Sequence, residues 1–167
     1  MNAAQLAALS TRRVWAMDVD YLHGMFTAAR TFARNMTIDR VAEKLDSGPR
    51  VNTVGKIAVL PLHGVIEQRQ SIWMDWFGGC STDQFGAMYQ TLMDDPKIKG
   101  IVVDIDSPGG TVSGVMERAD QIHASRGRKP VVGVANSKSA SAAYWIGSAF
   151  DQLYVTPSGG VGSVGVY

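Results

Sequence analysis

The second half of the chain alternates short apolar runs with amphipathic segments, a pattern typical of βαβ units. Buried strands are predicted at Lys56–Leu62, continuing past His63-Gly64 into Val65-Ile66, then at 98–105, 130–135 and 152–155. Helices are predicted between them at about 81–94 with Ser81 as the cap, 112–124 and 140–149. The continuous apolar centre of 98–105 is expected for a parallel sheet covered on both faces. The fold class predicted is therefore α/β with a mostly parallel sheet and right-handed crossovers.

The first fifty residues follow a different pattern. Residues 1–17 show no strong period and are expected to be partly disordered. Apolar residues at helical spacing predict a helix from Asp18 to about Phe32, with Asp18 or Asp20 as its cap, and a second helix at 37–45. Ser47-Gly48-Pro49 then interrupts the chain. We read 1–50 as an N-terminal helical arm and 51–167 as the main domain.

Composition narrows the classes of function. The 167 residues are 46% hydrophobic and 19% charged with a net charge of +1, which does not favour a nucleic-acid surface. The single cysteine, Cys80, excludes an internal disulfide and a multi-cysteine metal site. No apolar run approaches the ~20 residues of a membrane helix, and the start lacks the order of a signal peptide. We expect no membrane anchor in this chain and a cytoplasmic location.

A glycine-rich segment follows the strand at 98–105, where ligands of open α/β sheets bind. Asp106-Ser-Pro-Gly-Gly combines a fixed proline φ with two glycines, Gly109 and Gly110, that leave room for an approaching ligand. Residues 107–110 are predicted to form a turn at the mouth of the following helix, where free amides provide a site for an oxyanion. The alternative is a plain strand-to-helix turn.

Ser141 is the second candidate, because it follows the strand at 130–135 near a helix start. Alanines at 140, 142 and 143 would let that helix pack closely and expose the hydroxyl. The N–H of Ala142 could join those of Gly109 and Gly110 around one developing negative charge. The alternative is a serine that caps a buried alanine-rich helix.

Three blocks together are more specific: DSPGG at 106–110, ASAAYW at 140–145 and GGVGSVG at 159–165. They resemble the signal peptide peptidase A (protease IV) family, which has a Clp protease/crotonase-like fold. The resemblance covers about 56–167 and implies a serine peptidase whose nucleophile is Ser141. The resemblance also implies that the oxyanion donors are Gly109, Gly110 and Ala142. The substrate-lining residues that it implies are Gly162, Ser163 and His63.

The N-terminal arm carries a weaker resemblance to phage and prophage members. It rests on Val14–Met17, Tyr21-Leu22 and Ala28–Arg30. The phage branch implies an endopeptidase that trims scaffold, portal or capsid proteins in the host cytoplasm or the prohead interior. It further implies a homo-oligomer without cofactor or metal.

The base that activates the serine is not evident. His23, His63 and His123 are read as ordinary histidines, and none follows Ser141. The resemblance implies a Ser-Lys dyad whose lysine lies beyond Tyr167, so the catalytic domain is expected to be truncated at its C-terminal end and the fragment to turn over little. Lys138, three residues before Ser141, is the local alternative.

Other functions remain open at this point. The same blocks fit a bacterial signal peptide peptidase that degrades leader peptides, or an inactive assembly module of the same fold. A crotonase-like acyl-CoA enzyme has a similar oxyanion hole, but its activity would survive Ser141→Ala. The segment Trp73–Phe77 is read as a subunit contact, a substrate-lining loop or local core.

Overall fold

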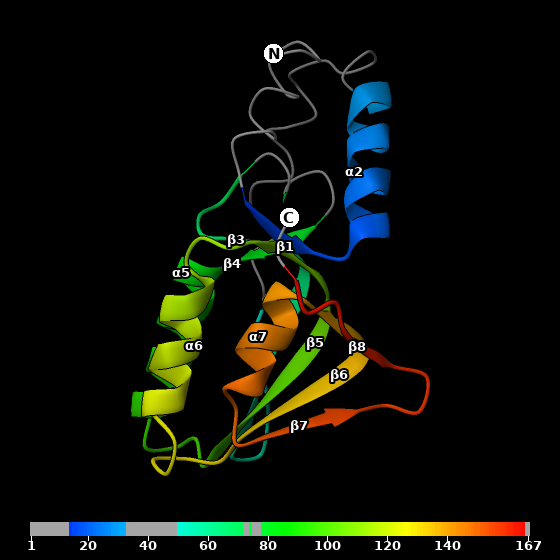
Figure 1. Ribbon diagram of the computed structural model, residues 1–167. Coiled ribbons are helices and arrows are strands. Elements are labelled where there is room, and N and C mark those ends of the chain that lie inside the picture. The colour runs from blue at the N-terminus through cyan, green and yellow to red at the C-terminus, as the bar shows by residue number, and fades with distance from the viewer. Residues whose placement is uncertain (1–13, 33–49, 72–73, 75–77, 166–167) are drawn as a thin grey trace.

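A computed structural model describes residues 14–32, 50–71, 74 and 78–165. The second helix predicted at 37–45 and all of the aromatic segment except Met74 lie outside these residues. Within them the chain forms a mixed sheet of eight strands with helices α5, α6 and α7 against it (Figure 1). The α/β class predicted from the sequence is confirmed.

The centre of the sheet is parallel. Its main path runs β2-β3-β5-β6-β7, with β3 (Ile57–Glu67), β5 (Gly100–Thr111), β6 (Val131–Ala140) and β7 (Gln152–Val155) all parallel. Short strands attach at the edges: β4 (Gly79–Ser81) is parallel to β3, β8 (Gly160–Gly162) is parallel to β6, and β2 (Asn52–Val54) is antiparallel to β3. The strands at 57–66, 100–105, 131–135 and 152–155 confirm the sequence prediction.

Three helices occupy the crossovers. They are α5 (Thr82–Asp94), α6 (Val115–Ala124) and α7 (Ala142–Ser148). The predicted cap of α5 is confirmed, because Ser81 Oγ accepts a hydrogen bond from the Gln84 N–H at 3.3 Å. The third helix is shorter than predicted, since β6 extends to Ala140 before the chain turns into α7.

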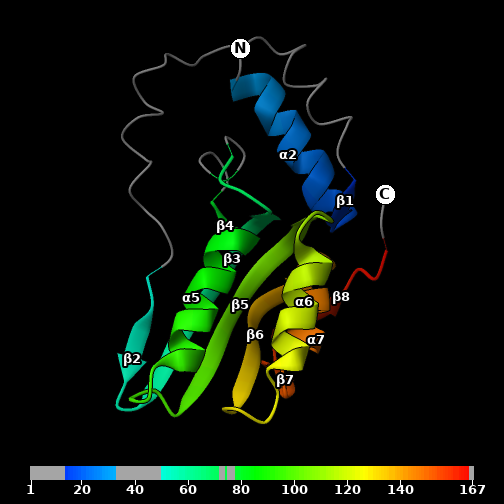
Figure 2. The same ribbon diagram turned by 90° about the vertical axis from the view of Figure 1, so that its left-hand side faces the viewer.

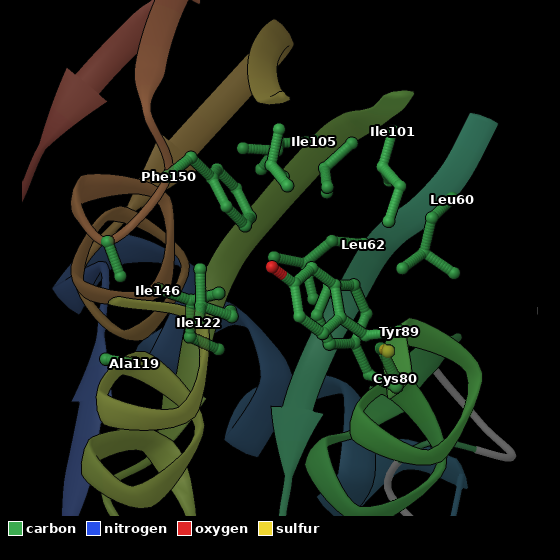
Figure 3. Packing of buried hydrophobic residues seen from close by; sticks show 14 of the residues in the cluster. Leu60, Leu62, Cys80, Tyr89, Ile101, Ile105, Ala119, Ile122, Ile146 and Phe150 are labelled. Carbon is green, nitrogen blue, oxygen red and sulfur yellow. The ribbon is translucent and has the colours of Figure 1, made fainter. Parts of the chain in front are cut away.

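All three helices pack on one face of the sheet, where they share a single apolar cluster (Figures 2 and 3). Residues on this face of β3 and β5, such as Leu60, Leu62 and Ile105, are at most 1% exposed. The alternate residues, such as Val59, Val102 and Asp104, are only half-buried. The expectation of a sheet covered on both faces is therefore wrong for the described residues. Exposure alternates from one residue to the next along these strands because the helices cover only one face of the sheet.

The N-terminal residues contribute a strand that the sequence did not suggest. β1 (Trp15–Met17) is antiparallel to β5, with Ala16 opposite Gly110. All of its side chains are buried, at 3% exposure or less. Helix α2 (Val19–Phe32) follows and rises from the end of the sheet where β1 lies (Figure 1). Partial disorder is predicted for 1–17; of these, 15–17 form a strand that is too short to show a period, and 1–13 lie outside the described residues.

Candidate active site

Ser141 lies at the junction between β6 and α7, as predicted, but with an unusual backbone. Its φ is 50° and its ψ is −110°, which is a rare conformation for a residue with a side chain. Such geometry costs on the order of 1–3 kcal/mol and persists where surrounding contacts fix it. Here the Ser141 N–H donates to Gly162 O and the Trp145 N–H donates to Ser141 O, both at 2.8 Å.

The Ser141 hydroxyl is directed toward the segment that follows β8. Its Oγ donates a hydrogen bond to the carbonyl oxygen of Gly165 at 3.2 Å, and the residue is 7% exposed. The same segment contains Ser163, the other non-glycine residue with a positive φ among those described, at 53°. Gly162 and Ser163 therefore lie next to Ser141. In this conformation the residues 162–165 cover the hydroxyl.

The 106–110 segment reaches the same place. A Cβ at Gly109 would lie 3.1 Å from Ala142 N and 2.9 Å from Ala140 O, so the backbone of Gly109 packs directly against the residues that flank Ser141. Ala142 is the first residue of α7, where the N–H has no partner within the helix. The sequence-predicted residues Ser141, Gly109 and Ala142 thus meet at the end of β6.

The backbone amides of Gly109 and Gly110 belong to a paired strand, in contrast to the free amides expected from the sequence. The Gly109 N–H donates to Ser107 Oγ at 3.1 Å, and Ser107 Oγ donates to Gly64 O at 2.6 Å. Gly110 lies between β1 and β3, where a Cβ would be 1.7 Å from Ile66 O. Gly109 is therefore nearer to the nucleophile than Gly110. To bind an oxyanion, the Gly109 N–H must give up its hydrogen bond to Ser107 Oγ.

The prediction that 107–110 forms a turn before a helix is wrong. These residues continue β5 as far as Thr111, and α6 begins only at Val115. The reason is that β3 pairs with Gly109 and Gly110 on one side and β1 pairs with 109–111 on the other. The helix end nearest to Ser141 is consequently that of α7 and not that of α6.

His63 lies on the half-buried face of the sheet, and no hydrogen bond joins this residue to Ser141. Its Nε2 is 3.0 Å from Asp104 Oδ2, with side-chain exposures of 51% and 31%. Both residues line a cavity of about 670 Å³ whose wall also includes Pro108 and Tyr21. His63 is thus connected to the Asp106–Gly110 segment through this cavity. His23 and His123 are exposed, and no described histidine has a hydrogen bond to Ser141.

Lys138 is part of β6 and not of a loop, contrary to the sequence prediction, because β8 pairs with 138–140. Its Nζ is 3.3 Å from Asp18 Oδ2. The pKa of Asp18 is lowered, mainly by the hydrogen bond from the Tyr21 N–H and further by Lys138, while partial burial opposes this. An ammonium group held by a carboxylate acts as a hydrogen-bond donor, which does not favour Lys138 as the general base.

Sequence reasoning missed Ser107 as the partner of the Gly109 amide and treated Asp18 only as a helix cap. Asp18 does cap α2, since its Oδ1 accepts from the Tyr21 N–H at 3.1 Å. The same residue donates its N–H to Pro108 O at 2.9 Å. The one available pointer to this region was the apolar run at 14–17, which carried a weak resemblance to phage proteins.

The comparisons with known proteins agree with the resemblance predicted from the sequence. Residues 123–167 match the model of Peptidase family S49. The chain is 37% identical over 113 residues to "Head-tail preconnector protein GP5" of Enterobacteria phage P21, covering 68% of this chain and 23% of the relative. It is 35% identical over 125 residues to "Capsid assembly protease C" of Escherichia phage lambda, covering 72% and 28%.

"Protease 4" of Salmonella typhi is 32% identical over 117 residues, covering 70% of this chain and 18% of the relative. The chain thus spans about a quarter or less of the curated relatives it matches. The predicted resemblance to the signal peptide peptidase A family and its phage branch is confirmed.

Solved structures with a similar fold include enoyl-CoA hydratases. One from Polaromonas sp. JS666 gives a TM-score of 0.53 at 14% identity, covering 69% of this chain and 50% of the other. A probable enoyl-CoA hydratase from Mycobacterium smegmatis gives 0.52 at 11%, covering 68% and 50%. At this identity the likeness concerns the fold, which is crotonase-like as predicted.

Among the described residues, no helix has the length and apolar character to cross a membrane.

Proposed function

We infer from the relationship with peptidase family S49 that this chain carries the nucleophile of a serine-type endopeptidase that acts during phage head maturation. The observation that carries the proposal is the strained backbone of Ser141 beside Gly109 and Ala142. A strained nucleophile at a strand-to-helix junction, packed against glycine-rich backbone, is an arrangement suited to acyl transfer.

In the proposed reaction Ser141 Oγ attacks the carbonyl carbon of a peptide bond. The hydroxyl proton passes to a general base, and the carbonyl oxygen becomes an oxyanion that accepts hydrogen bonds from the backbone N–H groups of Ala142 and Gly109. Collapse of this intermediate releases the amine, which takes up the proton, and leaves an acyl ester on Ser141. Water then hydrolyses the ester and regenerates the hydroxyl.

Two hydrogen bonds change before attack. The bond from Ser141 Oγ to Gly165 O breaks, because the hydroxyl must turn toward the base and the substrate. The bond from the Gly109 N–H to Ser107 Oγ is exchanged for one to the substrate carbonyl oxygen, which becomes the oxyanion on attack, and Ser107 Oγ keeps its bond to Gly64 O. We propose that peptide binding moves residues 162–165 aside, so that the covered hydroxyl becomes accessible.

The proposed base is a lysine beyond Tyr167, in a Ser-Lys dyad. Two observations support it: Lys138 is paired with Asp18, and no described histidine is bonded to Ser141. The relatives are several times longer than the part matched here, which leaves room for such a residue. The proposed substrates are scaffold, portal or capsid proteins, in line with the names of the two phage relatives. The proposed assembly is a homo-oligomer.

An inactive assembly module is the second candidate, favoured by the covered hydroxyl of Ser141. A fluorophosphonate probe distinguishes the two, using protein expressed from its full reading frame. We expect labelling of Ser141, identified by mass spectrometry of the peptide, and its loss in Ser141→Ala. Ser148→Ala at the other end of α7 is the matched control and should label normally. Absence of labelling in the folded parent protein would favour the assembly module.

A further inference from the structure

We propose that Asp18 is a positioning residue of the peptidase site, one that holds the nucleophile strand and the oxyanion segment in fixed relation. The inference rests on the proposed function, because it takes Ser141 and Gly109 as the reacting centre. It concerns a residue of the N-terminal arm, far away in sequence from both.

The first observation is the way in which the arm joins the sheet. Residues 15–17 pair with 109–111, so the arm forms a strand against the segment that contains Gly109. The Val112 N–H donates to Val14 O at 3.0 Å at one end of this ladder, and the Asp18 N–H donates to Pro108 O at 2.9 Å at the other. A Cβ at Gly109 would lie 2.4 Å from Ala16 O, so the arm is in direct contact with Gly109.

The second observation is that Asp18 connects three elements. Its main-chain N–H holds Pro108, the residue before Gly109. Its Oδ1 caps α2 through the Tyr21 N–H at 3.1 Å, and its Oδ2 is 3.3 Å from Lys138 Nζ. Lys138 belongs to β6, three residues before Ser141. Asp18 is therefore bonded both to the strand that carries the oxyanion segment and to the strand that carries the nucleophile.

These contacts matter because acyl transfer depends on small distances. A displacement of about 1 Å between reacting groups can lower a rate by about 100-fold. Trp15, Ala16 and Met17 are buried, and the Trp15 ring packs edge-on against Phe26 of α2 at 6.1 Å. Residues 15–17 thus form a firmly packed support from which the Asp18 carboxylate can hold Lys138. Its burial argues against a loosely bound strand that occupies the place of a substrate.

The test compares variants of the protein expressed from its full reading frame. Asp18→Asn keeps the helix cap and the main-chain bond to Pro108 but removes the charge that holds Lys138. Asp18→Ala removes the cap as well. Lys138→Gln removes the other partner of the ion pair. Asp20→Asn, on an exposed side chain two residues further on, is the control with the same change of charge.

We expect the rate constant for phosphonate labelling of Ser141 to fall about tenfold in Asp18→Ala and by less in Asp18→Asn, with Asp20→Asn unchanged. In peptide hydrolysis kcat should fall more than KM changes. The double variant Asp18→Asn/Lys138→Gln should lose no more than either single variant, because both remove one interaction. Amide hydrogen exchange should accelerate at Gly109 and Ala142 and stay unchanged in α5. A general loss of stability would accelerate exchange in α5 as well.

Each other outcome contradicts the proposal in a recognisable way. Equal labelling of wild type and Asp18→Ala would overturn the role of Asp18 and leave the proposed function intact. Faster labelling in Asp18→Ala would show that the arm blocks the site instead of supporting it. If the folded wild type does not label at Ser141, the proposed function fails and the role of Asp18 in it fails too.

Discussion

Gly109 occupies a position that a side chain does not fit. Its φ is +96°, and a Cβ would lie 2.4 Å from Ala16 O and 2.9 Å from Ala140 O. Both contacts are with backbone atoms, which cannot move aside as the end of a flexible side chain can. The residue therefore allows β1, β5 and the start of α7 to meet at one point.

From this we predict that Gly109→Ala lowers the rate of Ser141 labelling by a fluorophosphonate about 100-fold, the lower end of the effect of losing an oxyanion donor. Strain and displaced backbone should also lower the melting temperature, measured by circular dichroism. Gly160→Ala is the control, because Gly160 lies on the neighbouring β8, has no positive φ and has nothing within 4 Å of an added Cβ. Equal labelling of the two variants would contradict the placement of Gly109 at the reacting centre.

Single residues differ in how far the sequence could predict them. Ser141 was identified from ASAAYW and lies at the predicted junction, but its φ of 50° follows from bonds to Gly162 and Trp145 that only the fold brings into place. The Asp18–Lys138 pair spans 120 positions in sequence. No local pattern predicts a contact between residues so far apart, so Asp18 could be predicted only as a cap.

At the scale of elements, α7 is held at its carbonyl end by one side chain. Arg126 donates from Nε to Ala149 O at 3.0 Å and from Nη2 to Ser148 O at 3.1 Å, and it also reaches Phe150 O. A guanidinium group is well suited to this position, because its donors satisfy free carbonyls and its charge complements the helix dipole. The helix that begins after Ser141 is thereby fixed at its far end.

We predict that Arg126→Ala lowers the free energy of unfolding by about 1–2 kcal/mol, since hydrogen bonds from a charged group are among the stronger ones. Urea unfolding of the purified chain measures this. Arg128→Ala is the matched control: Arg128 forms an ion pair with Asp94 at 2.7 Å with both side chains about half exposed, and solvent screens such a pair so that it contributes little to stability. A larger loss in the Arg128 variant would refute the assignment.

The hydrophobic pattern predicts the positions of the long strands and helices well. The strand at 57–67 and the helices at 82–94 and 115–124 lie close to their predicted positions. Two errors have one cause, which is pairing between distant segments. Strand β5 continues through a proline and two glycines because β1 and β3 pair with it there, and β1 itself is a strand only through that pairing.

On the scale of the whole molecule, the core lies between one face of the sheet and three helices, and two ionisable groups are built into it (Figure 3). Cys80 is 1% exposed, and burial raises the pKa of its thiol from 9.0 to about 12. Burial also raises the pKa of Tyr89, whose hydroxyl is 2.6 Å from Ser125 Oγ. Both side chains are neutral in the fold at neutral pH.

A raised pKa of an acid group makes stability depend on alkaline pH with a definite sign. Above about pH 9 the unfolded thiol ionises while the folded thiol keeps its proton, so the unfolded state binds fewer protons and the free energy of unfolding falls as pH rises. The effect of Cys80 should therefore be absent at neutral pH and increase from about pH 9 to about pH 12. Ionisation of Tyr89 adds to it at higher pH.

We predict that wild type loses about 1 kcal/mol more than Cys80→Ala between about pH 8.5 and pH 10, which is the share of one thiol whose pKa rises by the stated amount. Urea unfolding at a series of pH values measures the difference. The small cavity left by the missing sulfur lowers the stability of the variant at every pH and so does not affect the slope. Parallel curves for the two proteins would mean that the Cys80 thiol ionises as readily in the folded state as in the unfolded chain, and that solvent reaches the core between α5 and the sheet.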